Sequence, residues 1–141
     1  MRIYADSSFF VSIYLEDSHT KAAIQRLARR PDIWLTPFHA AEFANAVAQQ
    51  IFRRSLSQEA GEGAHRNFEI DRDAGLWRSA AFPEGTFRVA ASLARTHVIR
   101  LGTRTLDSLH VAAALELGAK QFWTFDERQA KLAKAAGLRI T

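Results

Sequence analysis

Four acidic residues, far apart in the chain, occupy positions from which their side chains could act together. Asp6 and Asp126 each end a short β-like run and precede a helical segment. Asp107 lies in the first turn of an apolar helix, and Glu42 lies one or two turns into another. Carboxylates that gather at one place repel one another unless a cation neutralises them. Because the chain has no cysteine and no histidine at ligand spacing beside these acids, an all-oxygen site for Mg²⁺ or Mn²⁺ is predicted.

Each acid taken alone also has a purely structural explanation. Asp6, Asp107 and Asp126 can stabilise a helix N-terminus, where free N–H groups and the helix dipole favour an acid. Glu42 can be an exposed helix residue. These explanations stay open for each residue, and only the joint placement favours a cation. A divalent ion held there would orient water and stabilise charge on a phosphoryl oxygen.

The helices and strands that would position these acids follow from hydrophobic periodicity. Residues 104–115 predict a helix that is apolar nearly all round and therefore buried on most sides. Strand-like and helical segments alternate, which predicts an α/β/α sandwich with a central, mainly parallel sheet of four or five strands. In such a sheet the carboxyl ends of the strands form the ligand-binding edge. The predicted strands are 2–5, 33–36, 121–125 and 138–140; the predicted helices include 19–30, 37–54, 85–96, 104–115 and 127–136.

The region between these elements is less regular. Ser57 is predicted to open a further helix, whereas residues 97–101 are predicted to be short and extended. Trp34 and Trp123 lie in strand-like runs and are predicted to be core residues. Trp77, in the irregular stretch, is the better candidate for an exposed anchor that a partner or second subunit would cover.

Composition limits the class of protein. The chain has 141 residues, 48% hydrophobic and 24% charged, which is typical of one soluble globular domain spanning 1–141. It has no apolar run near the ~20 residues of a membrane helix. The first residues enter a strand at once, so no signal peptide is expected, and the lack of cysteine fits a cytoplasmic location. The net charge of +4 allows a polyanionic partner without requiring one.

Several stretches resemble the PIN-domain nucleases, and among them the VapC toxins of bacterial toxin–antitoxin pairs. The resemblance rests on four stretches in the family's order along essentially the whole chain: Asp6-Ser7-Ser8 after a first strand, Glu42 in a helix, Arg104-Thr105-Leu106-Asp107-Ser108-Leu109-His110, and Thr124-Phe125-Asp126. The last two are specific, whereas Asp6-Ser7-Ser8 alone would not be.

The resemblance implies a Mg²⁺-dependent endoribonuclease, with Mn²⁺ as an alternative ion and structured RNA such as tRNA as the substrate class. Asp6, Glu42, Asp107 and Asp126 would surround the metal, with Asp6 and Asp107 as its most direct ligands. Ser8 and Thr124 would orient the carboxylates. A cognate antitoxin protein and a second copy of the chain are the partners that it implies.

Two neighbouring residues have open roles. Arg104 could contact a phosphate or pair with a carboxylate, and the sequence favours neither of these roles over the other. His110, three residues beyond Asp107, could transfer a proton but is more simply a packed, hydrogen-bonded histidine.

The sequence is also compatible with two other functions. The first is a catalytically silent RNA- or protein-binding domain of the same architecture, whose RNA binding would not respond to EDTA. The second is an aspartyl-phosphate phosphohydrolase, which needs a second Asp two residues after the nucleophile. Ser8 occupies that position after Asp6, so this rival ranks low.

Overall fold

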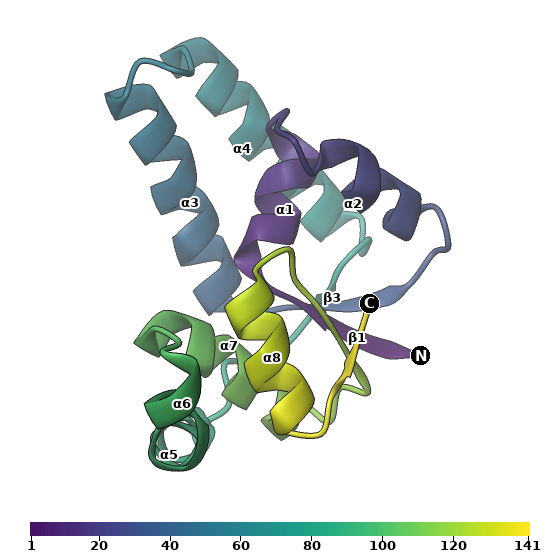
Figure 1. Cartoon of the computed structure of the whole chain (residues 1–141). Coiled ribbons are helices and arrows are strands. Elements are labelled where there is room, and N and C mark those ends of the chain that lie inside the picture. The colour runs from purple at the N-terminus through teal and green to yellow at the C-terminus, as the bar shows by residue number, and fades with distance from the viewer.

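The structure, a computed structural model, describes all of residues 1–141 as two layers of helices on a parallel five-stranded sheet (Figure 1). The strands lie in the order β3-β2-β1-β4-β5, and every pairing is parallel. This confirms the predicted α/β/α sandwich. The elements are β1 (Arg2–Ala5), α1 (Ser7–Tyr14), α2 (Thr20–Leu27), β2 (Asp32–Leu35), α3 (Pro37–Phe52), α4 (Gln58–Asp73), β3 (Arg78–Ser79), α5 (Thr86–Leu93), a π-helical turn (Ala94–Val98), α6 (Ile99–Leu101), α7 (Thr105–Glu116), β4 (Gln121–Trp123), α8 (Glu127–Ala135) and β5 (Arg139–Ile140).

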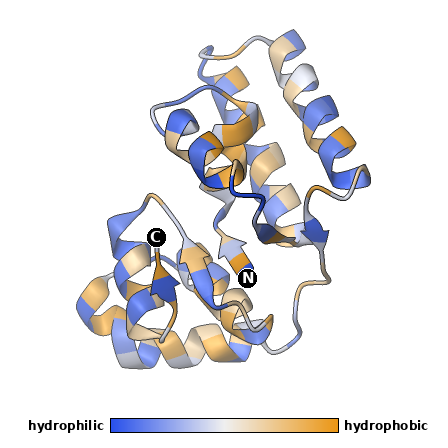
Figure 2. Cartoon of the chain, turned by 90° about the vertical axis from the view of Figure 1, so that its right-hand side faces the viewer, coloured by the Kyte–Doolittle hydropathy of each residue, from blue (hydrophilic) through white to orange (hydrophobic).

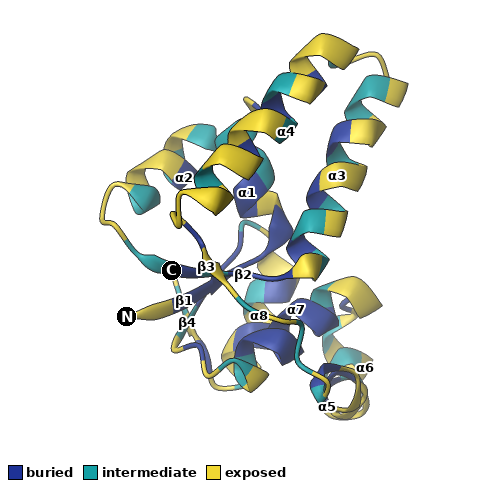
Figure 3. Ribbon diagram, turned by 180° about the vertical axis from the view of Figure 1, so that it is seen from behind, coloured by how far each residue is buried: buried dark blue, intermediate teal, exposed yellow.

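The alternating side chains of the central strand divide the core into two clusters. Ile3 and Ala5 of β1 face the layer formed by α1 to α4, and Tyr4 faces the layer formed by α5, α7 and α8. The helices carry hydrophobic and hydrophilic residues on different sides, as amphipathic helices that cover a sheet do (Figure 2). Burial is greatest in the central strands β1, β2 and β4 and in the helix faces against them, while the edge strand β3 and the outer end of the α3–α4 hairpin are exposed (Figure 3).

Helix α7 is the most buried helix of the second layer. Seven successive residues, Ser108 to Ala114, are buried, which confirms the expectation from its nearly uniform apolar character. Its packing against α5 and α8 fixes the first turn of the helix, where Asp107 lies, at the edge of the core.

Residues 57–84 contain the helix that was expected and a strand that was not. Ser57 caps α4, its hydroxyl accepting the N–H of Ala60 at 3.0 Å. Gly61 brings α4 close to α3, since a β-carbon there would lie 2.7 Å from Ile51 Cδ1. Arg78 and Ser79 then pair with β2 as the edge strand β3, which is too short to leave a periodic signal in the sequence.

Two local predictions were wrong. Residues 97–101 are helical, because α5 continues through a π-helical turn into α6. Trp77 is 2% exposed and belongs to the core. It precedes β3, so its ring packs against Phe9 and Phe10 and its Nε1–H donates to the Tyr14 hydroxyl at 2.9 Å. Trp123 is buried as predicted, and Trp34 is partly buried.

No helix combines the length and the apolar character that crossing a membrane demands.

We expect Tyr14→Phe to lower the free energy of unfolding by about 1–2 kcal/mol, because it leaves the buried N–H of Trp77 without an acceptor. The Tyr14 hydroxyl also donates to Asp71 at 2.8 Å, and that contact is lost as well. Urea unfolding of the two proteins measures the difference. A change below about 0.3 kcal/mol would show that this hydrogen-bonded chain does not stabilise the fold.

Candidate active site

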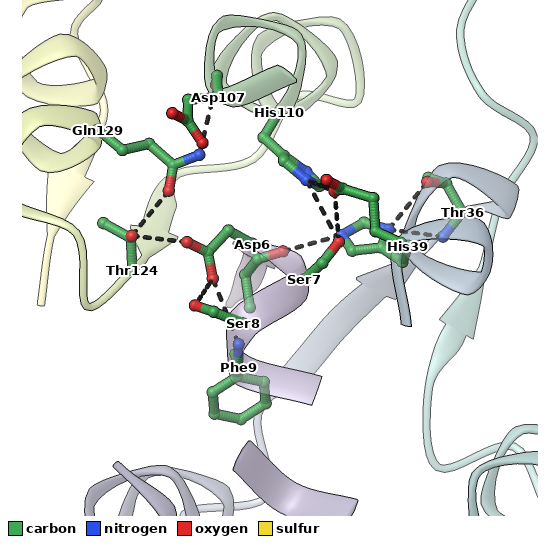
Figure 4. A network of polar contacts seen from close by, with 12 residues as sticks. Asp6, Ser7, Ser8, Phe9, Thr36, His39, Asp107, His110, Thr124 and Gln129 are labelled. Atoms are coloured by element: carbon green, nitrogen blue, oxygen red, sulfur yellow. Dashed lines mark hydrogen bonds and ion pairs between the residues drawn. The ribbon is translucent and has the colours of Figure 1, made fainter. Parts of the chain in front are cut away.

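Asp6 ends the central strand, and donors from two directions hold its carboxylate. Oδ1 accepts the Ser8 hydroxyl at 2.5 Å and the backbone N–H of Phe9 at 3.3 Å. Oδ2 accepts the Thr124 hydroxyl at 2.7 Å (Figure 4). The register of β1 and β4 explains the last contact: Ala5 pairs with Trp123, so the next residues of the two strands adjoin. Asp6 is buried, and both of its oxygens have a fixed direction.

Asp126 follows β4 and caps α8. Its Oδ1 accepts the backbone N–H of Gln129 at 2.8 Å, and its own N–H donates to the Thr124 hydroxyl at 3.0 Å. The structural explanation offered for Asp6 and Asp126 therefore holds, since each caps a helix. Capping a helix does not exclude a second role at the site for Asp126, because this residue remains exposed.

Asp107 shares the electrostatic field of these acids. Burial raises the pKa of its carboxyl, and the charges of Asp126 and Asp6 raise it further, while His110 and Arg104 act in the opposite direction. The side chain is half-buried in the first turn of α7. Three acids from three distant segments therefore lie close enough for their charges to repel.

Asp107 and Asp126 line one polar hollow of about 520 Å³ that has no hydrophobic residue in its wall. Arg104 and Arg128 line it too, and neither forms an ion pair within 4.0 Å. Arg104 thus affects Asp107 through its charge without pairing with it. Glu127 faces the same hollow and adds a further acid to it.

Glu42 lies toward the other side, held by residues of α1 and α7. It contacts His110 Nε2 and accepts the Ser7 hydroxyl at 2.8 Å. Burial alone would raise the pKa of Glu42, but the hydrogen bonds and charge of His110, with the Ser7 hydroxyl, outweigh it and lower the pKa. A second hollow of about 570 Å³ lies beside Glu42, and Ser8, His19 and Leu106 form part of its wall.

Both ring nitrogens of His110 have a polar partner. The hydroxyl of Tyr4, whose pKa burial raises well above its usual value, lies 2.9 Å from His110 Nδ1. His110 Nε2 contacts the Glu42 carboxylate. His110 is buried and fully engaged, as the structural interpretation of this residue predicts.

His39 fixes the backbone immediately before Asp6. Its Nε2–H donates to the carbonyl of Ala5 at 2.8 Å, and its Nδ1 accepts the N–H of Thr36 at 3.0 Å. Burial, with the charge of His110, lowers the pKa of His39 to about 3, so the ring is neutral. A neutral ring with these two roles links the ends of β1 and β2.

No three His, Asp or Glu side chains are arranged so that they alone could hold one metal ion. The carboxylates of Asp6, Asp126 and Glu42 are instead turned toward their own donors. Mg²⁺ commonly keeps several waters and takes only one or two carboxylates. The all-oxygen donors and the raised pKa of Asp107 fit an ion bound in that way.

The PIN-domain family model matches residues 3–135. The chain belongs to the PIN-domain family. No curated protein sequence gives a significant match.

Solved structures with a similar fold include VapC20 from Mycobacterium tuberculosis, described as a sarcin-ricin loop cleaving toxin. It has a TM-score of 0.70 and 18% identity over 96% of this chain and 95% of that one. VapBC2 from Rickettsia felis, bound to a DNA fragment from its promoter, has a TM-score of 0.66 and 16% identity over 100% of this chain and 98% of that one. FitAcB from Neisseria gonorrhoeae has a TM-score of 0.72 and 18% identity over 98% of this chain and 95% of that one. The TM-scores and coverages show a shared fold.

Sequence reasoning missed Arg128 and Gln129. Gln129 stands three residues after the capping acid Asp126, a spacing typical of a capping box, and this signal could have drawn attention to it. Arg104, which the sequence already offered as a candidate to contact a phosphate, lines the acidic hollow together with Arg128. Nothing in the sequence separates Arg128 from the other arginines of the chain.

We expect Asp107→Asn to raise the melting temperature of the metal-free protein at pH 7, because it removes a half-buried charge that Asp126 and Asp6 repel. Since the pKa of Asp107 is raised on folding, its ionisation makes wild-type stability fall as pH rises from its unfolded pKa through its folded one. The gain should therefore shrink as the pH is lowered through the same range. Thermal melts in EDTA across pH 4–7 test this.

Added Mg²⁺ should stabilise the wild type more than Asp107→Asn, because the ion binds a site that needs the charge. An Asn variant that melts below the wild type in EDTA at pH 7 would contradict the proposed repulsion.

Proposed function

We propose that this protein is a Mg²⁺-dependent endoribonuclease, with Mn²⁺ as an alternative ion, and the toxin of a toxin–antitoxin pair. The observation that carries the proposal is that Asp107, Asp126 and Asp6 lie close together at the edge where β1 and β4 end, so that the charges of Asp126 and Asp6 add to burial in raising the pKa of Asp107. Repelling carboxylates at this edge are what a divalent cation would bind. Membership of the PIN-domain family adds support.

In this proposal Asp6 and Asp107 hold the cation most directly, and Asp126 completes its negative surroundings. Glu42, whose lowered pKa keeps it ionised, contributes charge from the opposite side. Ser8 and Thr124 hold Asp6 in its direction. When bound, the ion supplies positive charge beside the scissile phosphate and activates water.

The substrate class is RNA, with structured RNA such as tRNA as the first candidate. The unpaired guanidinium groups of Arg104 and Arg128 lie in the hollow beside the acids. They would contact phosphates on either side of the bond to be cleaved, since guanidinium groups bind phosphate oxygens through charge-assisted hydrogen bonds. The reaction is hydrolysis: water adds to phosphorus and the bond to the 3′-oxygen breaks.

The proposed partners are a cognate antitoxin and a second copy of the chain. Two of the structures with a similar fold, VapBC2 and FitAB, are described as bound to DNA fragments. We extend the toxin–antitoxin arrangement to this chain, acting as one domain in the cytoplasm.

One observation favours a different function, a catalytically silent RNA-binding domain. No three acidic or histidine side chains are arranged to hold an ion without help. This alternative predicts RNA binding that EDTA does not change and no cleavage when Mg²⁺ or Mn²⁺ is added.

The test is cleavage of labelled structured RNA by the purified chain with Mg²⁺, Mn²⁺ or EDTA. We expect metal-dependent cleavage that falls at least about 100-fold in Asp6→Asn and Asp107→Asn, because each removes charge from the ion's surroundings. Glu59→Gln, which changes an exposed acid at the start of α4, is the matched control and should keep full activity. Full activity of folded Asp107→Asn, or cleavage unaffected by EDTA, would overturn the proposal.

A further inference from the structure

Gln129 is an almost completely buried polar residue that contacts two of the segments carrying the acids, those of Asp126 and Asp107. It is 1% exposed, in the first turn of α8. Its backbone N–H donates to Asp126 Oδ1 at 2.8 Å. Its side-chain amide lies between the Thr124 hydroxyl, at 2.7 Å, and the carbonyl oxygen of Asp107, at 3.4 Å (Figure 4). Burying an amide in such a place costs free energy unless its hydrogen bonds are made.

The Thr124 hydroxyl has one proton and three polar neighbours. Asp6 Oδ2 and the amide oxygen of Gln129 each lie 2.7 Å from it, and the N–H of Asp126 donates to it at 3.0 Å. The single hydroxyl proton is shared between the two oxygens, so the position of the Asp6 carboxylate depends on the amide oxygen of Gln129.

The other end of the Gln129 amide reaches a different segment. Its N–H donates to the carbonyl oxygen of Asp107 at 3.4 Å. The same buried side chain therefore joins the first turn of α7 to the residues that follow β4, and both of its polar atoms have a partner.

We infer that Gln129 is a positioning residue of the acidic site. Its amide oxygen holds the Thr124 hydroxyl, which also donates to Asp6, and its amide N–H donates to the carbonyl of Asp107. Its backbone N–H holds Asp126. This inference rests on the proposed metal site, because its consequence is an Asp6 carboxylate held in a fixed direction toward an ion. Neighbours of this kind are worth about 10–100-fold in metal affinity.

The experiment measures the dissociation constant of Mn²⁺ for the full chain by titration calorimetry. Gln129→Met keeps the volume of the side chain and removes its hydrogen bonds. We expect it to weaken Mn²⁺ binding about 10-fold. In RNA cleavage kcat should fall while KM for RNA changes less than about twofold, because Gln129 touches acids rather than the phosphate-binding arginines. Should the Met variant fail to fold, Gln129→Asn, one methylene shorter, replaces it.

A double variant separates positioning from general destabilisation. If Gln129 acts through the Thr124 hydroxyl, Gln129→Met should cost less than about twofold when Thr124→Val is already present. Leu132→Val, at a fully buried position on the same helix, is the control. It should lower the melting temperature and leave the Mn²⁺ dissociation constant within about twofold.

Three outcomes would overturn the inference. Gln129→Met could leave the Mn²⁺ affinity unchanged, or the double variant could lose Mn²⁺ affinity by the product of the factors lost in Gln129→Met and Thr124→Val. The third is a wild type that binds no Mn²⁺. Failure of the proposed function looks different. A wild type whose Mn²⁺ affinity depends on Gln129 and Thr124, yet which cleaves no RNA, would refute the nuclease and leave the role of Gln129 intact.

Discussion

The site depends on the parallel pairing of β1 with β4. This pairing sets Ala5 opposite Trp123, so the residues that follow the two strands meet at the carboxyl edge. Asp6 therefore accepts a hydrogen bond from the Thr124 hydroxyl, and Asp126 follows two residues after Thr124. β1 is also where the strand order reverses direction, with β2 and β3 on one side and β4 and β5 on the other. Open α/β sheets bind ligands at such points.

Capping a helix and binding a cation are compatible roles for the same acid. One oxygen of Asp6 caps α1, and the other accepts a hydrogen bond from the Thr124 hydroxyl. One oxygen of Asp126 caps α8, and the residue remains exposed. The pKa of Asp107 is raised, because burial and the charges of Asp126 and Asp6 disfavour its ionised form. Stability given up at one carboxylate is a common feature of binding sites.

Much of the fold could be predicted from the sequence because its signals are local. Residues 2–5 and the helix around 104–115 have strong periodic or uniform apolar patterns, and both elements are present. β3 could not be predicted, since two residues carry no period, and with it the burial of Trp77 was missed. The extended prediction for 97–101 failed because α5 continues through a π-helical turn.

Some residues of the candidate site could likewise be predicted from the sequence, and others could not. Asp6, Asp107 and Asp126 follow from their positions after strands and in a first helical turn. Gln129 and the Tyr4–His110–Glu42 contacts depend on packing between segments that are distant in the chain. The spacing from Asp126 to Gln129 indicates Gln129 itself, but the partners of its side chain and those of His110 appear only once the sheet is assembled.

The central claim is that a divalent cation neutralises the acids at this edge, and diffraction at the manganese absorption edge tests it directly. Crystals grown with Mn²⁺ should show an anomalous peak within coordination distance of the Asp6 and Asp107 carboxylates, with water completing the shell. Diffraction from Asp107→Asn crystals grown in the same way should show the peak lost or weakened. A saturating Mn²⁺ concentration that leaves this edge without a peak, while the acids keep their present hydrogen bonds, would contradict the account.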